Sequence, residues 1–198
     1  SHHNFIFDSM IFHVTIYVIE DIHDMWYIRC FIILSITTGQ LDIAKIPVQN
    51  APDWIVPKAL ILTIDAYSER IWTYLWQKQD VCVYHLLPKT ATPTHLVVLE
   101  SVTDIHRLAL QIQGDVTFKS VRIADLKDLD DATYQELLSL QYPALAADTL
   151  LPSTDDQATP LEANTSKALV YQPVLLNDEL CVVPDLDKLS HLLVDLDS

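Results

Sequence analysis

The chain has 198 residues, half of them hydrophobic, and a formal net charge of −15 at pH 7. This length fits one domain with room for an extension, and the hydrophobic content is enough for a sizeable core. Nucleic acid and anionic membranes are bound by clustered Lys and Arg, so the charge argues against both and permits a basic protein partner. Excess carboxylates also keep an apolar domain soluble, which is the favoured explanation of the charge.

Residues 1–41 differ in composition from the rest, and we expect them to form an atypical N-terminal extension. The uncharged run from Cys30 to Thr38 is far shorter than the roughly 20 residues of a membrane span, and a secretion signal would need a basic start. The extension could add strands to the fold, bind a partner, or be translated from upstream of the natural start, which we favour slightly. Glu20 and His23 have a metal-binding spacing, but one such pair is a weak signal and we expect no metal there.

The middle of the chain reads as a series of short strands. Three apolar runs are separated by Pro, Thr, Asp and Lys, as in turns: Val81 to Leu87, Leu96 to Leu99 and Leu108 to Ile112. In the third run the large apolar residues alternate with Ala109 and Gln111, which predicts one buried face and one wet face. Gly114 and Asp115 are expected to turn the chain into another strand. Several short strands at this spacing predict a barrel or a sandwich.

The last third of the chain contains two expected helices and a hairpin. Asp130 or Asp131 can cap a helix over residues 132–140, and residues 151–167 have the composition of a solvated, flexible loop. Two apolar runs around Asn177 to Glu179 predict a hairpin, because Asn and Asp tolerate unusual backbone angles. Leucines at helical spacing between Asp185 and Leu196 predict a short closing helix.

The sequence contains no motif that indicates catalysis or a cofactor. It lacks G-x-S-x-G, a glycine-rich phosphate loop and H-E-x-x-H, and it has two glycines in all. His85 is interpreted as a half-buried side chain satisfied by the backbone rather than as a catalytic base. The acidic cluster around Asp130 is interpreted as helix capping rather than a calcium loop. We therefore predict no catalytic residues, no cofactor-binding or metal-binding residues and no cofactor.

Cysteine usage indicates a reducing compartment. The three cysteines, Cys30, Cys82 and Cys181, include no C-x-x-C pair, and an odd number cannot all form intramolecular disulfides. Cys82 and Cys181 lie in apolar strand patterns, where a small buried thiol is expected more often than a nucleophile or a metal ligand.

Several segments resemble, in order, the later strands of CheW-like domains, the coupling proteins of bacterial chemosensory arrays. The segments are DVCVYHLL, THLVVLE, HRLALQIQGDVTFKSVRI and VYQPVLLNDELCVVPDLDKLSHLL. Upstream, Ile55 to Asp65 looks like the strand and short helical turn that lead into the family's second strand, preceded by a turn at Asn50 to Pro52. The resemblance covers about residues 42–196, which we predict to be the domain. It is most similar to the small CheW-like proteins of type IV pilus chemosensory systems.

This resemblance implies a mainly β fold of two small SH3-like β-barrel subdomains of CheW type with a few short helices. It implies a non-catalytic adaptor that couples chemoreceptors to a histidine kinase, here in a system that controls type IV pilus motility. The implied partners are the kinase regulatory domain and the cytoplasmic tip of a chemoreceptor. The implied location is the cytoplasm, at membrane-bound receptor arrays, without direct insertion into the membrane.

The largest departure from the family lies at Leu75 to Lys78, where the family usually has an Asn-Leu-Arg-Gly turn. Gln77 replaces the Arg that often belongs to the receptor-facing surface, and Lys78 replaces the Gly that allows a positive φ. We nevertheless predict a partner-binding surface at Trp72, Trp76, Gln77 and Lys78, since aromatic and long polar side chains suit interfaces. An equally strong interpretation is that the two Trp side chains fill the core between the barrels.

Two alternatives to the adaptor function stay open. The chain could be a small β-rich ligand-binding domain or enzyme whose site has no recognisable motif. It could also be a decayed member of the family, with the fold but without coupling activity, because the Arg and Gly of the turn are missing.

Overall fold

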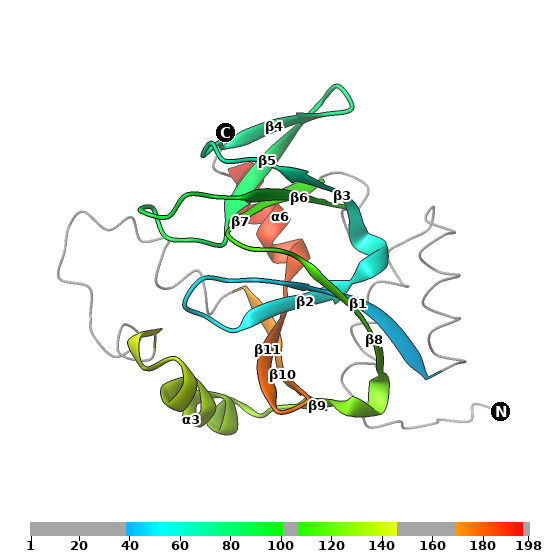
Figure 1. Ribbon diagram of the computed structural model, residues 1–198, viewed down its shortest axis with the longest axis vertical. Coiled ribbons are helices and arrows are strands. Elements are labelled where there is room, and N and C mark those ends of the chain that lie inside the picture. Colours follow the sequence, from blue (N-terminus) through cyan, green and yellow to red (C-terminus); the bar gives the residue numbers. More distant parts are fainter. Residues whose placement is uncertain (1–38, 101–106, 146–168, 196–198) are drawn as a thin grey trace.

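A computed structural model describes residues 39–100, 107–145 and 169–195, with side chains up to Ser190 (Figure 1). In this part of the chain the fold is mainly β, with two curled sheets and a few short helices, as predicted. Residues 1–38 and 151–167, which include Cys30 and the Glu20–His23 pair, lie outside the described residues. No helix in the described part is long and apolar enough to cross a membrane.

The first sheet, called sheet A here, has six strands in the order β8-β1-β2-β11-β10-β9. The strands are β1 (Gln40–Ile46), β2 (Asp53–Pro57), β8 (Thr117–Arg122), β9 (Leu126–Asp128), β10 (Val170–Leu176) and β11 (Glu179–Pro184). All neighbours are antiparallel except β11 and β2, which run parallel. The C-terminal hairpin therefore lies inside a sheet that the beginning of the domain also builds.

The second sheet, sheet B, has five strands in the order β3-β6-β7-β5-β4. The strands are β3 (Ile61–Ala66), β4 (Thr73–Trp76), β5 (Gln79–His85), β6 (His95–Leu99) and β7 (Leu108–Ile112). Its centre is the parallel pair β5 and β7, and the strand β4 forms one edge. The three predicted apolar runs correspond to β5, β6 and β7, so these predictions are confirmed.

Helices form where the sequence supplies a capping side chain. Helix α3 spans Asp131–Gln141, and the Asp130 carboxylate accepts a hydrogen bond from the Thr133 amide at 2.8 Å. Helix α6 spans Leu186–Asp195, and the Asp185 carboxylate accepts one from the Lys188 amide at 3.0 Å. Such caps satisfy amides that the first turn of a helix leaves unpaired. Both helices are confirmed, and two short 3-10 turns, η1 (Lys58–Leu60) and η2 (Ile123–Asp125), join strands.

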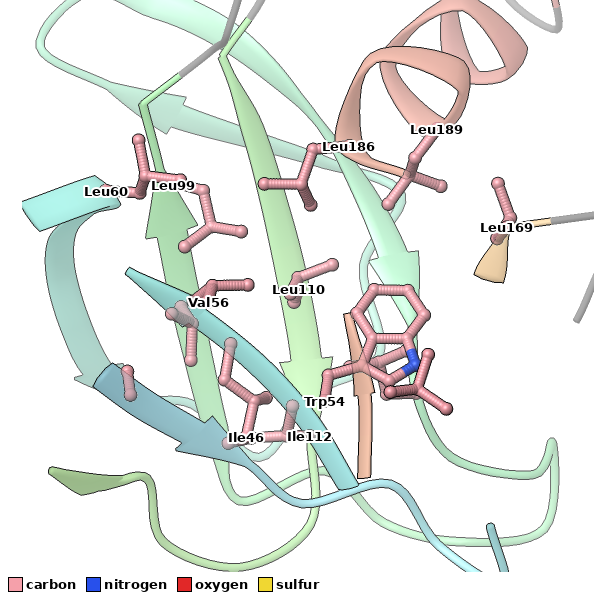
Figure 2. Packing of buried hydrophobic residues seen from close by; sticks show 14 of the residues in the cluster. Ile46, Trp54, Val56, Leu60, Leu99, Leu110, Ile112, Leu169, Leu186 and Leu189 are labelled. Atoms are coloured by element: carbon pink, nitrogen blue, oxygen red, sulfur yellow. The ribbon is translucent and has the colours of Figure 1, made fainter. Parts of the chain in front are cut away.

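The main hydrophobic core lies between the two sheets and beneath α6, as Figure 2 shows for Ile46, Leu110 and Leu189. Each sheet also has a smaller buried cluster on its other face. The cluster of sheet A is Ile43, Ile55, Val121, Val174, Leu176 and Cys181, and that of sheet B is Val81, Val83, Leu96, Val98 and Ala109. Each sheet thus curls around a core of its own while the two share a central one.

The strand β7 corrects one prediction. All five of its residues are buried, so the expected wet face does not exist. Ala109 lies in the cluster of sheet B, and the Gln111 side chain is buried with its polar atoms bonded to the backbone. The alternation along the run arises because the strand packs on two cores, not because one face meets water. The strand that follows Gly114 is present as β8, but it pairs with β1 in the other sheet.

Candidate protein-binding surface

Three of the predicted partner-binding residues, Trp76, Gln77 and Lys78, lie on the hairpin of β4 and β5, and Trp72 directly precedes β4. The strand β4 is an edge strand of sheet B. The side chains of Trp72 and Leu75 are 69% and 67% exposed, and both are large and apolar. Gln77 and Lys78 are also exposed. We call Trp72, Leu75, Gln77 and Lys78 the edge surface. Within the described part of the chain β4 pairs with β5 alone, so its other side presents backbone groups that another strand could bind.

The turn of this hairpin has two residues with positive φ, although neither is Gly, Asn or Asp. Gln77 and Lys78 have φ values of 49° and 69°, the two positive angles of a type I′ turn. Register pairs Trp76 with Gln79 across this two-residue loop. Lys78 therefore adopts the positive φ that Gly takes most easily, and the turn forms without a glycine. The turn at Asn50 is likewise present, with φ at 62°.

Trp72 is exposed, but the backbone around it is held by hydrogen bonds. The side chain of Gln111 makes two hydrogen bonds to the segment just before Trp72. Its amide group donates to the Glu69 carbonyl at 2.6 Å, and its oxygen accepts from the Ile71 amide at 3.2 Å. The carbonyl of Trp72 accepts from the amide of Val83 at 2.9 Å. An interpretation of Trp72 as core filling between the barrels is therefore wrong, because this side chain faces outward from a fixed backbone.

His85 lies against Trp72 and supports the same segment. The two rings meet edge to face with centroids 4.5 Å apart, and the His85 Nε2 contacts the Ile71 carbonyl at 3.0 Å. Burial lowers the pKa of His85, and the charge of Arg70 lowers it further. The prediction of a half-buried histidine satisfied by the backbone is confirmed.

Trp76 has a different environment from Trp72. Its half-buried ring packs against the cluster of sheet B, not against the core between the sheets. The guanidinium of Arg107 lies 5.1 Å from the ring centroid, and Arg107 also donates to the side-chain oxygen of Gln79 at 2.7 Å. Glu100 lies 3.2 Å from the Arg107 Nε. This cation–π contact and its polar neighbours fix the end of the hairpin, so Trp76 supports the surface more than it forms it.

Sequence reasoning missed Leu75, Gln111 and Arg70. Arg70 donates hydrogen bonds to the carbonyls of Pro88 and Ala91, at 2.6 and 3.1 Å, and so ties the β3–β4 connection to the β5–β6 loop. The signal that could have indicated Gln111 is a polar residue inside an otherwise apolar run. From the sequence alone, the alternation of Gln111 with apolar residues indicates the wet side of a strand.

A separate hollow of about 610 Å³ lies where the start of α3 meets β9 and β10. The residues that line it include Asp128, Asp130, Asp131, Tyr134 and Tyr171. In the described residues no group of three or more His, Cys, Asp or Glu side chains is placed to hold a metal ion. Asp130 acts as the cap of α3, as interpreted from the sequence.

Comparisons with known proteins find similarity among solved structures. No protein-family model matches the chain, and no curated protein sequence matches it. The crystal structure of the scaffolding protein TtCheW from Thermoanaerobacter tengcongensis aligns with a TM-score of 0.43 and 8% identity. The alignment covers 73% of this chain and 88% of that chain.

Proposed function

We propose that this protein is a non-catalytic adaptor that couples chemoreceptors to a histidine kinase in a bacterial chemosensory system controlling type IV pilus motility. Its partners are the kinase regulatory domain and the cytoplasmic tip of a chemoreceptor. It acts in the cytoplasm, at membrane-bound receptor arrays. Trp72, Trp76, Gln77 and Lys78 are the residues that we assign to partner binding, and Leu75 joins them because it is exposed on the same hairpin.

The observation that carries this proposal is the exposure of Leu75 on the edge strand β4 and of Trp72 directly before it, on a backbone held by hydrogen bonds. A large exposed apolar side chain costs a protein solubility, whereas Trp is among the residues that contribute most at protein interfaces. A fixed backbone lowers the entropy that is lost on binding. The ordered resemblance of the strand segments to CheW-like domains gives the proposal its class of partner.

The test is capture of partners by the full chain from lysate of its source cell, followed by mass spectrometry. We expect recovery of a histidine kinase or a chemoreceptor, and Trp72→Ala should reduce that recovery at least tenfold, as expected for an interface hot spot. Leu140→Ala is the matched control, because Leu140 is 72% exposed but lies on α3. Recovery of neither class of protein by folded wild-type chain would contradict the adaptor function.

One alternative has an observation in its favour. The hollow beside α3 is within the size range of small-molecule sites, and it combines tyrosines with carboxylates. A ligand-binding domain should gain thermal stability with a small cationic compound, and Tyr171→Ala should remove that gain. A stabilised protein that captures no signalling partner would favour this alternative. Folded protein with neither property would favour a decayed member of the family.

A further inference from the structure

Gln111 is a fully buried polar side chain in the middle of sheet B. A buried amide side chain is costly unless its donor and its acceptor are both hydrogen-bonded. Both are used here, on the Glu69 carbonyl and the Ile71 amide, which belong to the segment leading into Trp72. The side chain of Gln111 in β7 therefore bonds to the backbone of residues 69–71 and not to the backbone of its own strand.

His85 acts on the same segment from the neighbouring strand. In the parallel pairing of β5 with β7, His85 is the register partner of Gln111. The His85 Nε2 contacts the carbonyl of Ile71, whose amide is bound by Gln111. One residue therefore has both backbone polar groups held by side chains from two adjacent strands, and it directly precedes Trp72.

We propose that Gln111 and His85 are positioning residues that hold the Glu69–Trp72 backbone on sheet B and so fix the orientation of Trp72. The inference rests on the proposed function for the use of Trp72 as a docking anchor, but not for its position. Because the hydrogen bonds form when the chain folds, the ordering of this segment is complete before a partner arrives. An exposed Trp on a mobile connection would instead lose conformational entropy at the moment of binding, which would weaken the affinity.

The protonation state of His85 belongs to this arrangement. The charged group that acts on His85 is Arg70, while the side chains that reach it from β7 and from the start of β4, Gln111 and Trp72, carry no charge. A proton added to His85 would place a second positive charge near Arg70 in a half-buried site. The uncharged ring is therefore the form present at pH 7, with its Nε2–H donating to the Ile71 carbonyl.

The first experiment compares Gln111→Leu with Gln172→Leu in the full chain. Gln172 is a matched control, because it is also a buried strand Gln whose side chain bonds to backbone groups, here two carbonyls, but it lies in sheet A. Fluorine NMR of 5-fluorotryptophan, with Trp72 assigned by Trp72→Phe, reports the orientation of the ring. Hydrogen exchange of a peptide covering residues 69–72 reports its backbone.

We expect Gln111→Leu to shift the Trp72 resonance and to speed exchange of the 69–72 peptide roughly tenfold or more, since two hydrogen bonds are lost. Gln172→Leu should leave both signals unchanged, even if it lowers global stability. Equal effects of the two variants would overturn the inference, because Gln111 would then act only through the stability of the fold.

A second experiment needs no variant with a changed core. In the wild-type chain the Trp72 resonance should move as His85 titrates, with a midpoint below pH 6.5, and His85→Gln should abolish the movement. A Trp72 resonance that stays constant through the titration of His85 would contradict the role of His85. If Trp72→Ala leaves partner capture intact while these signals behave as expected, the docking function of Trp72 fails and its positioning stands.

Discussion

Two hairpins in this protein have the same kind of two-residue turn but differ in the strands that surround them. The β4–β5 hairpin turns at Gln77 and Lys78, and the β10–β11 hairpin turns at Asn177 and Asp178. All four residues have positive φ, between 49° and 69°. Yet β10 and β11 have neighbours on both sides in sheet A, whereas β4 is an edge of sheet B.

The neighbours, not the turn, decide what the strands expose. In the terminal hairpin Val174, Leu180 and Cys181 are completely buried, because other strands and two hydrophobic clusters cover them. In the first hairpin Leu75 stays largely exposed on the short strand β4, which has no neighbour on its other side in the described part of the chain. The comparison separates a hairpin whose two strands both build the core from one whose edge strand β4 is open on one side, while its partner β5 is buried.

The largest contrast is expected in thiol reactivity. Burial raises the pKa of Cys181 to about 11, so at pH 8 only about one thiol in a thousand is the reactive thiolate. A chain that keeps Cys181, with Cys30→Ser and Cys82→Ser, should react with a thiol reagent at least a hundredfold more slowly when folded than in urea. A chain that keeps only Cys82, which is half-buried in β5, should show less protection. Equal protection of the two thiols would remove this contrast.

Truncation of a leucine in each hairpin should give the next largest difference. Leu180 is completely buried in the core between the sheets, so Leu180→Ala should reduce the free energy of unfolding by about 2–5 kcal/mol. Leu75→Ala should change it by about 0.5 kcal/mol or less, because the side chain already meets water. Urea unfolding of both variants makes the measurement. A cost above about 2 kcal/mol for Leu75→Ala would show that the edge surface is part of the core.

The turns themselves should differ by a smaller amount. Lys has no side-chain group that stabilises a positive φ, whereas Asp tolerates it. Lys78→Gly should therefore raise the free energy of unfolding by about 0.5–1 kcal/mol, and Asp178→Gly should raise it less. Urea midpoints for the two variants test this order, and a larger gain at Asp178 would contradict it.

The sequence predicts the terminal hairpin because its signal is local. Asn177 and Asp178 lie between two apolar runs, and the Asp130 cap and the leucine spacing of α6 are local in the same way. The strand β4 was not predicted, since Gln77 and Lys78 are poor turn signals. The positive φ values of Gln77 and Lys78 follow from the pairing of β4 with β5, and the sequence of the turn does not reveal that pairing.

Long-range packing explains what else the sequence does not reveal. The burial of Gln111 depends on Glu69 and Ile71, some 40 residues away along the chain. The exposure of Trp72 depends on the order of strands in sheet B, which places β4 at an edge. The assignment of Trp72, with its neighbours on the hairpin, to partner binding stays a prediction.

The smallest effect expected is a pH dependence that only the first hairpin has. Burial first, and then the charge of Arg70, holds the pKa of His85 below its ordinary value of 6.5. The unfolded chain therefore binds a proton more readily than the folded one. The stability associated with uncharged His85 is complete above pH 6.5 and is lost as the pH falls through the lower pKa of the folded state.

Urea unfolding of wild type and His85→Gln at several pH values between 7.5 and 5 isolates this effect, because the other titrating groups are common to both chains. The advantage of wild type over His85→Gln should shrink as the pH falls, whereas a constant or growing advantage would show that the folded state accepts the charge. Residues 170–184 contain no His, so the terminal hairpin has no counterpart to this response. A loss of stability that follows the titration of His85 therefore reports on the contacts that hold the segment before Trp72. Those contacts are absent from the terminal hairpin.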